Sequence, residues 1–371
     1  MESQVSRYSS IISESLSPVV RCAAPVQAAS FAQLAMNETP YGPSQMVLKA
    51  IHRAAKATNC YPDGQHVALR DRLAKELKLE PRRILISAGS AALLQLVACA
   101  LLKPGDNAVT STKSYLFYRT ITEMFGARLI EAPMKDTAID LASIRGSITP
   151  RTKVIFIANP NNPTGTMLEA SRMNCFLDDI PQHVTVVLDE AYSDFACHFA
   201  KQRGVEYSNS TEYVRQGRNV LTLRTFSKAF ALAGLRIGYG FADTRVINLL
   251  ARFQTQFSVT NVAASAALAA LDDKVHKEKV LKNNSDQADW MRQHLHKLGF
   301  RVSPTWGNFL YIKTNHAAEI LAAELRKEGV AVRGLTAWGA PRAIRVTIGK
   351  PVDNLHFVRS FELVARKHCG R

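Results

Sequence analysis

Short apolar runs recur along the first two thirds of the chain and alternate with stretches that have helical spacing. Residues 154–158 and 184–188 are runs rich in β-branched side chains, and residues 84–88 form a similar segment. Runs of this length and composition are typical of strands that are buried on both faces of a parallel sheet. Because helical and strand patterns alternate up to about residue 240, the sequence predicts a mostly parallel sheet with helices on both faces.

Helical spacing occurs between residues 47 and 77, where Leu69, Leu73 and Leu77 share one face. A repeat of three to four residues indicates helices that bury one side against a core. The pattern changes after about residue 299, where short strand-like runs replace it and indicate a second, smaller region. The other predicted elements are helices over 90–102, 262–271 and 275–298, and strands over 309–312 and 344–348.

Composition agrees with a globular chain of two domains. The chain has 371 residues, of which 47% are hydrophobic and 21% are charged, and this length exceeds one ordinary domain. No apolar run reaches the length of a membrane span, and the N-terminus does not resemble a signal peptide. The six cysteines are scattered, with no pair at the spacing of metal ligands. We therefore predict reduced thiols, no metal site and a cytoplasmic location.

The formal net charge of +16 raises the question of nucleic-acid binding. Lysine and arginine are spread along the chain, however, and no RNP, helix-turn-helix or zinc-finger pattern is present. Diffuse positive charge favours solubility and attracts small anions. We therefore predict anionic small-molecule ligands and neither a nucleic-acid nor a membrane partner.

The most informative segment contains Lys228. This lysine follows Thr225 and Ser227 and precedes an almost wholly apolar run over 229–235, which is unlike an exposed loop, and Arg236 comes eight residues later. A primary amine can form a Schiff base with a carbonyl, while hydroxyls and a guanidinium can hold a phosphate. Pyridoxal 5′-phosphate (PLP) carries both an aldehyde and a phosphate, so this cluster predicts a PLP site.

A second segment supplies a carboxylate. Asp189 ends the predicted strand 184–188, and ligands of α/β sheets bind outside the carboxyl ends of the strands. A carboxylate that faces the pyridine nitrogen of PLP keeps the ring protonated and therefore electron-withdrawing. Tyr192, three residues later, can donate a hydrogen bond to the ring oxygen. The alternative is that Asp189 only caps the following helix.

A third segment is the loop over 159–165, which follows the strand 154–158. Its two prolines, one glycine and three asparagines predict a rigid and sharply turning connection. The loop can be a simple turn between a strand and a helix, or it can hold one amide side chain against a flat ligand. The two interpretations are compatible.

Together these segments resemble the fold-type I PLP-dependent enzymes, and specifically the class I and II aminotransferases. The match is closest to the histidinol-phosphate aminotransferase branch and extends from about residue 35 to about residue 358. The order and spacing of its motifs make a chance match very improbable. The matching motifs are 36–43, 61–64, Leu69 with Arg70, Gly89 with Ser90, 159–165, 189–192, 223–230, 307–309, Val332 with Arg333, and 344–349.

The resemblance implies an α/β fold with a large domain, built on a mostly parallel sheet flanked by helices, and a smaller α+β domain. It implies an N-terminal arm over 1–45 that contributes to the small domain, a large PLP-binding domain over 46–260 and a small C-terminal domain over 261–371. It also implies a homodimer in which Tyr61 reaches the cofactor of the other subunit.

The resemblance also implies roles for individual residues. Lys228, Asp189 and Tyr192 would be catalytic, with Lys228 bonded to the cofactor and then moving a proton as a general acid and base. Tyr115 would stack on the cofactor ring, although it could also be only a core aromatic residue. The implied cofactor-binding residues are Ser90, Ala91, Tyr115, Asn162, Asp189, Tyr192, Thr225, Ser227, Lys228, Arg236 and Tyr61.

Substrate recognition is implied for two arginines and two arm residues. Arg345 would bind the substrate carboxylate and Arg333 a distal phosphate, because a guanidinium forms a bidentate fork with such anions. Each arginine could instead be a solvated surface residue. Asn37 and Tyr41 complete the implied substrate-binding set. The implied substrates are a small-molecule amino donor, with histidinol phosphate as the leading candidate, and a 2-oxo acid such as 2-oxoglutarate.

The chain departs from the family pattern at three places. Lys113 and Ser114 replace the usual Pro-Thr before Tyr115, alanines replace acidic residues after Ser90, and residues 256–259 lack the expected Pro-Tyr segment. The last change lies near the expected side-chain pocket for the substrate. Two alternatives therefore stay open, namely an aminotransferase for an aromatic or other amino acid and a PLP-dependent lyase that resembles threonine-phosphate decarboxylase.

Overall fold

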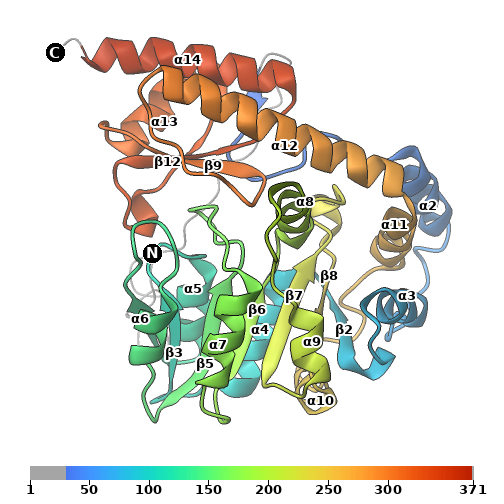
Figure 1. Cartoon of the computed structure of the whole chain (residues 1–371). Helices are drawn as coiled ribbons and strands as arrows, with labels where there is room; N and C mark the ends of the chain where they lie inside the picture. The colour runs from blue at the N-terminus through green and yellow to red at the C-terminus, as the bar shows by residue number, and fades with distance from the viewer. Residues whose placement is uncertain (1–30, 370–371) are drawn as a thin grey trace, which may run out of the picture.

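The computed structural model describes residues 31–369, so residues 1–30 of the predicted N-terminal arm lie outside the described residues. The chain forms a large sheet with helices around it and a smaller region above this sheet (Figure 1). Among the helices of residues 31–369, none has both the length and the apolar character needed to cross a membrane.

The large sheet has seven strands and is parallel except at one strand. The order is β2-β8-β7-β6-β5-β3-β4, and β8 runs antiparallel to both of its neighbours. The carboxyl ends of the other strands therefore point to one edge of the sheet. The strands are β2 Ile84–Ser87, β3 Asn107–Ser111, β4 Arg128–Ala132, β5 Thr152–Ala158, β6 Thr185–Asp189, β7 Val220–Thr225 and β8 Gly238–Phe241.

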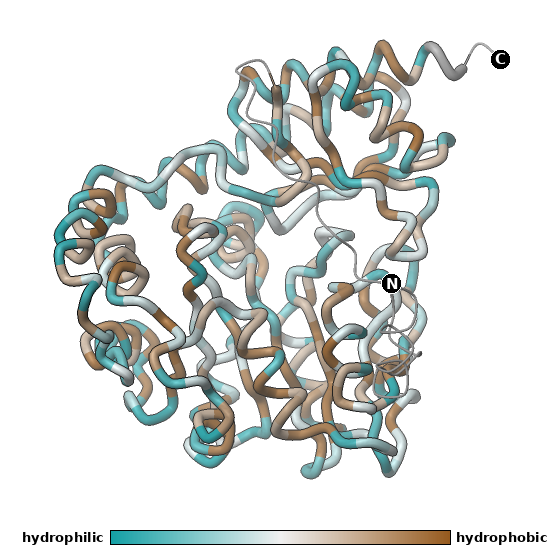
Figure 2. The backbone as a smooth tube through the Cα atoms, turned by 180° about the vertical axis from the view of Figure 1, so that it is seen from behind, coloured by the Kyte–Doolittle hydropathy of each residue, from teal (hydrophilic) through white to brown (hydrophobic). Residues whose placement is uncertain are grey.

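Helices cover both faces of this sheet, because its central strands are apolar on both sides. Val154 and Phe156 of β5 pack with one set of helices, whereas Ile155 and Ile157 pack with the opposite set. Figure 2 shows many hydrophobic stretches, coloured brown, in this part of the molecule. The helices of this region are α2 Gln45–Ala55, α3 Val67–Leu77, α4 Ser90–Leu101, α5 Phe117–Met124, α6 Leu141–Gly146, α7 Ala170–Asp178, α8 Ser193–Arg203, α9 Ser210–Arg215 and α10 Thr244–Ala251, with 3-10 helices η1 Pro81–Arg83 and η2 Ala233–Leu235.

The smaller region has a three-stranded antiparallel sheet in the order β11-β12-β9, and a two-stranded pairing of β1 with β10. The pairing of β1 joins the described end of the arm to this region. Helices α12 (Lys274–Lys297), α13 and α14 bury apolar side chains against it. The elements are β1 Ala32–Gln33, β9 Phe309–Lys313, β10 Val330–Ala331, β11 Arg333–Gly334, β12 Ala343–Thr347, α13 Ala318–Lys327, α14 Pro351–Cys369 and η3 Thr336–Trp338.

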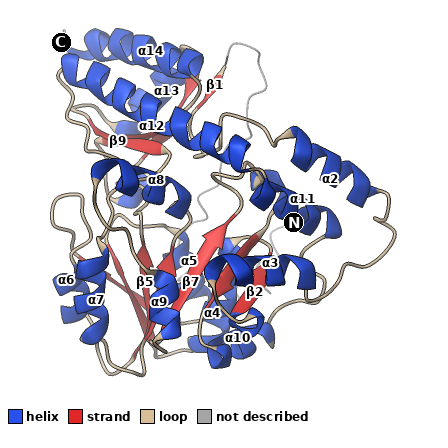
Figure 3. Cartoon of the chain, turned by 45° about the vertical axis from the view of Figure 1, so that its right-hand side comes forward, coloured by secondary structure: helices blue, strands red, loops and turns tan. Residues whose placement is uncertain are grey.

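Two helices lead from the large region to the small one, and they follow the predicted domain boundary at residue 261. Helix α11 (Asn261–Asp272) packs on α2 and α3 and shares a core with the large sheet, as Figures 1 and 3 show. Helix α12 (Lys274–Lys297) then runs from this side to the small region, where it packs on α14. The alanine-rich composition of α11 allows close helix packing but does not indicate which core it joins, and in the structure it packs in the core that includes β2 and β8 of the large sheet.

Candidate active site

The sheet topology brings the predicted site segments to one edge. Gly89 and Ser90 follow β2, the loop 159–165 follows β5, Asp189 ends β6, and Lys228 follows β7. These four strands run in the same direction, so their carboxyl ends meet. This edge is where α/β sheets bind ligands.

Lys228 lies in the turn after β7 and points to the arm. Its Nζ donates hydrogen bonds to the carbonyl oxygens of Asn37, at 3.0 Å, and Met36, at 3.4 Å. The hydroxyl of Thr39 donates to the carbonyl oxygen of Lys228 itself. Burial lowers the pKa of the Lys228 amine to about 8, and the positive charge of Arg345 contributes to this shift. An amine with this pKa is partly unprotonated near neutral pH and can act as a nucleophile.

Asp189 is buried at the end of β6. Its Oδ2 accepts a hydrogen bond from the hydroxyl of Tyr118, at 3.0 Å, and its Oδ1 accepts one from the backbone N–H of Ala191, at 3.2 Å. Burial raises its pKa to about 6. The N-cap of α8 is Tyr192 rather than Asp189, so the structure does not support the helix-capping alternative. A buried carboxylate of this kind is stabilised by a cation or a donor on a ligand.

Asn37 joins the two regions of the molecule at the site. This arm residue is buried with a positive φ of 54°, and its side-chain amide donates to the hydroxyl of Tyr192 at 2.9 Å. Its backbone N–H donates to the hydroxyl of Thr347 at 2.9 Å, and its carbonyl oxygen accepts from Asn308 at 3.0 Å. The arm therefore orients Tyr192 and the carbonyl oxygen that Lys228 contacts.

The N-terminus of α4 forms a cradle for an anion. Gly89, with φ of 90°, is its N-cap and supplies no side-chain cap, so the first backbone N–H groups, at Ser90 and Ala91, lack helical partners. A Cβ on Gly89 would meet the Nη2 of Arg236 at 2.9 Å, so the guanidinium lies directly beside this turn. A Cβ on Gly238 would meet the backbone nitrogen of Ser90 at 3.0 Å.

Hydroxyls complete the cradle. Arg236 also donates to the hydroxyl of Ser227 at 3.4 Å, and the hydroxyl of Thr225 donates to that of Ser227 at 2.9 Å. Backbone N–H groups, two hydroxyls and one guanidinium at a helix N-terminus suit a phosphate. The donor set present here therefore fits the phosphate of PLP, while Lys228 and Asp189 lie at the same sheet edge.

The two predicted substrate arginines lie opposite each other. Arg333 of β11 and Arg345 of β12 are cross-strand neighbours in an antiparallel pair, so their side chains are on the same face. Arg345 is 6% exposed, and it donates to the side-chain oxygen of Asn162 at 2.6 Å and to the carbonyl oxygen of Ala35 at 2.8 Å. Arg333 contacts the sulfur of Met36 at 3.2 Å.

Aromatic rings surround the Arg345 guanidinium. Its centre is 5.5 Å from the ring of Phe309 and 6.0 Å from that of Trp338. Two rings around a desolvated guanidinium hold it in place. The structure thus buries Arg345, which excludes the alternative of a solvated strand residue.

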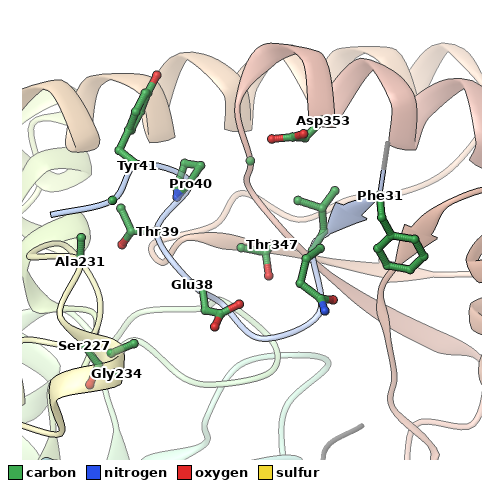
Figure 4. A pocket seen from close by; sticks show the side chains of 15 residues that line it. Phe31, Glu38, Thr39, Pro40, Tyr41, Ser227, Ala231, Gly234, Thr347 and Asp353 are labelled. Carbon is green, nitrogen blue, oxygen red and sulfur yellow. The ribbon is translucent and has the colours of Figure 1, made fainter. Parts of the chain in front are cut away.

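The predicted tyrosines occupy three different surroundings. Tyr115 contacts the ring of Tyr118 edge-on at 5.6 Å and lines a cavity of about 430 Å³. Tyr41 donates to Asn283 at 3.2 Å and lines a second cavity of about 380 Å³, with Ser227 and Gly234 on its opposite wall (Figure 4). Tyr61 is 82% exposed.

Sequence reasoning did not select Tyr118, Thr347 or Asn308. Tyr118 belongs to the aromatic run 114–118, and its spacing of three residues from Tyr115 places both on one side of the helix start. That spacing was the available signal. Its partner Asp189 is 71 residues away in the chain, and such a contact follows only from the sheet order.

Comparisons with known proteins agree with this geometry. The family model for class I and II aminotransferases matches residues 30–361. The chain is 36% identical over 332 residues to histidinol-phosphate aminotransferase 2 of Carboxydothermus hydrogenoformans, and the match covers 90% of each chain. The structure of histidinol-phosphate aminotransferase from Sinorhizobium meliloti in complex with PLP superposes with a TM-score of 0.83, at 26% identity, and covers 91% of this chain and 92% of that one.

A third neighbour has a different activity. The L-threonine-O-3-phosphate decarboxylase of Porphyromonas gingivalis superposes with a TM-score of 0.78 at 21% identity, and covers 90% of this chain and 99% of that one. At this identity the likeness shows the fold alone, which therefore does not distinguish a transaminase from a lyase.

The fold and the site define a fold-type I PLP-dependent enzyme. The chain belongs to the class I and II aminotransferases and is a PLP-dependent aminotransferase. The fold class, family and cofactor predicted from the sequence are thereby confirmed.

Proposed function

We propose that this aminotransferase moves an amino group between histidinol phosphate and a 2-oxo acid such as 2-oxoglutarate. The observation that carries the proposal is the cross-strand pair of Arg333 and Arg345 beside the site. Two adjacent guanidiniums suit a phosphate ester as well as a carboxylate. The relatives named histidinol-phosphate aminotransferase support the same donor.

We propose that PLP is held by the residues at the sheet edge. The cradle of Ser90, Ala91, Thr225, Ser227 and Arg236 would bind its phosphate. When bound, PLP supplies an aldehyde and a ring that withdraws electrons.

The same proposal assigns the groups around the ring. Asp189 would face the ring nitrogen, Tyr115 would stack on the ring, and Tyr192 and Asn162 would donate to the ring oxygen. Lys228 would bond to the aldehyde and then move a proton from the substrate as general base.

The substrate would lie between the arm and the small sheet. Arg345 would bind the carboxylate, or the equivalent anchoring group, of each substrate, and Arg333 would bind the phosphate of histidinol phosphate. Asn37 and Tyr41 would line the rest of the site. We also propose a cytoplasmic enzyme, a setting in which its scattered cysteines stay reduced.

An aminotransferase for an aromatic amino acid is the second candidate. Phe309 and Trp338 flank Arg345, and apolar rings near a carboxylate-binding guanidinium also suit an aromatic donor. The two candidates differ in whether the donor has a distal anion, so the effect of replacing Arg333 on activity distinguishes them.

Replacing each arginine by alanine should produce different defects. Arg345→Ala should weaken the binding of every amino acid donor and 2-oxo acid by about 2–4 kcal/mol, because the substrate carboxylate would then be desolvated without its partner. Arg333→Ala should lower kcat/KM for histidinol phosphate and spare phenylalanine. The measurement is steady-state kinetics with each donor.

Arg245→Ala is the matched control, because Arg245 is exposed and pairs only locally with Asp243. Its kinetics should equal those of the wild type. If Arg333→Ala changes nothing with any donor, the proposed phosphate-reading role is wrong.

We propose that the active unit is a homodimer in which Tyr61 acts across the interface. Tyr61 is exposed on this chain and its ring lies 4.9 Å from that of Phe257, which is 42% exposed. Two neighbouring exposed aromatic rings suit a protein interface.

Mixing two inactive variants tests this arrangement. Refolding Lys228→Ala and Tyr61→Ala chains together in equal amounts should restore about a quarter of wild-type activity, since half of the dimers are mixed and each has one complete site. Sedimentation velocity should show a dimer. No recovery on mixing, or full activity in a monomer, would contradict the proposal.

A further inference from the structure

Tyr118 lies beneath the proposed cofactor site and has no role in the function described so far. It is in the first turn of α5 and has no exposed surface. Its ring stacks on that of Phe156, with centroids 4.9 Å apart and an interplanar angle of 6°. This packing fixes the ring plane and hence the direction of the hydroxyl, which donates to Asp189 Oδ2 at 3.0 Å.

We propose that Tyr118 is a positioning residue that holds the Asp189 carboxylate ionised and oriented, and that also supports the ring of Tyr115. The inference rests on the proposed role of Asp189 at the ring nitrogen. Tyr118 would not touch the cofactor itself. It would position Asp189, at the edge of the cofactor ring, and Tyr115, on the face of that ring.

The direction of the hydrogen bond follows from chemistry. Burial raises the pKa of the Tyr118 phenol well above its usual value, and the charge of Asp189 adds to this rise. The phenol therefore keeps its proton and donates it. An ionised carboxylate accepts hydrogen bonds without donating any, so donation from Tyr118 favours the ionised form of Asp189.

Other charges near Asp189 do not replace this contact. Glu190 is adjacent and opposes ionisation, but its carboxylate pairs with Arg224 at 2.9 Å. The Lys228 amine favours ionisation, but its hydrogen bonds go to the arm. Tyr192 donates no hydrogen bond to Asp189 and instead accepts one from Asn37. Donation to the Asp189 carboxylate therefore comes from Tyr118 and from the backbone N–H of Ala191.

Tyr118 also contacts Tyr115. The two rings meet edge to face, with centroids 5.6 Å apart and an interplanar angle of 89°. Edge-to-face contact is a favourable aromatic geometry, so the Tyr118 ring limits the orientations open to Tyr115. Tyr118→Phe keeps this ring and removes only the hydroxyl, which separates the two parts of the role.

The first test is a pH titration of Asp189 in the cofactor-free protein. The titration is monitored by NMR of enzyme that is labelled with carbon-13 at its aspartate carboxyls. The Asp189 signal is assigned by its loss in Asp189→Asn. In Tyr118→Phe, Asp189 should titrate at higher pH than in the wild type. Tyr213→Phe, which removes another buried tyrosine hydroxyl away from Asp189, should leave the titration unchanged.

The second test uses the loaded enzyme. Tyr118→Phe should lower kcat about 10- to 100-fold, the range expected for one hydrogen bond to a charged group, with KM changed little. In an Asp189→Asn background the same substitution should have almost no further effect, because the carboxylate that it serves is gone. Equal losses in both backgrounds would indicate a merely structural role.

A third variant guards against misfolding of Tyr118→Phe. Incorporating 3,5-difluorotyrosine at position 118 makes the phenol a stronger donor, so Asp189 should titrate at lower pH. An Asp189 titration that responds to neither change at position 118 would overturn the inference. The titration needs no substrate, so its outcome is distinct from a failure of the proposed transamination.

Discussion

Replacing Lys228 by alanine should leave the fold intact and lower the rate of transamination by about 10³-fold or more. The expected loss is large because one amine would serve both as the nucleophile for the cofactor aldehyde and as the proton-transfer group. Its surroundings suit both tasks, since burial lowers the amine pKa to about 8. Multiple-turnover kinetics with saturating PLP measure the loss, and circular dichroism checks the fold.

Lys282→Ala provides the matched control, because Lys282 is exposed on α12 and pairs with Asp286. That variant should retain full activity. Borohydride reduction of the PLP-loaded wild type, followed by peptide mapping, should find the cofactor on Lys228. A label on a different lysine would refute the assignment.

Replacing Asp189 by asparagine should lower kcat by on the order of 100-fold, with PLP still bound. The substitution keeps the shape and removes the charge that would hold a proton on the ring nitrogen. The amide oxygen can still accept from the backbone N–H of Ala191, and the amide NH2 group, in place of Oδ2, can donate to the hydroxyl of Tyr118, so the local structure should persist. Rapid kinetics and the visible absorption of bound PLP measure the two effects. Turnover near that of the wild type would mean that Asp189 does not serve the ring.

The same substitution should stabilise the cofactor-free protein above pH 6. Burial raises the pKa of Asp189 from 3.8 to about 6, so between these values the folded protein binds more protons at this group than the unfolded chain does. The contribution of Asp189 to stability therefore decreases as pH rises through this window. Asp189→Asn should remove the decrease and be more stable at pH 7 by up to roughly 2–3 kcal/mol.

Urea denaturation of both cofactor-free proteins at pH 4, 5, 6 and 7 checks this expectation. The difference between variant and wild type should grow from pH 4 to pH 6 and then stay constant. If the difference in the free energy of unfolding does not depend on pH, burial does not raise the pKa of Asp189 in the folded state.

The sequence predicted those features that depend on short segments. The apolar runs at 154–158 and 184–188 are strands β5 and β6, and their polar ends carry the loop 159–165 and Asp189. Lys228 could be selected because its own neighbours in the chain, hydroxyls before it and an apolar run after it, form its surroundings. Local sequence is sufficient for these residues because the turn that follows a strand lies at the edge of the sheet where ligands bind.

Other features depend on packing between distant segments. Arg333 and Arg345 could be proposed to converge, but the register that places them opposite each other is set by the turn at Thr336–Trp338. Tyr118 and Asp189 meet only because α5 covers the face of β5 and β6. The alanine-rich sequence of helix α11 has no feature that distinguishes the two cores, so its packing in the core with β2 and β8 follows only from the three-dimensional structure.

The most direct test of the central claim is a half-reaction of the PLP-loaded enzyme with histidinol phosphate and no 2-oxo acid. An aminotransferase should transfer the amino group once to the cofactor, so the visible band of the lysine-bound form should disappear in one turnover and return when 2-oxoglutarate is added. Histidinol phosphate should react at lower concentration than phenylalanine. If the band stays while carbon dioxide is released from an amino acid donor, the enzyme is a lyase, and if only phenylalanine bleaches the band, the proposed donor is wrong.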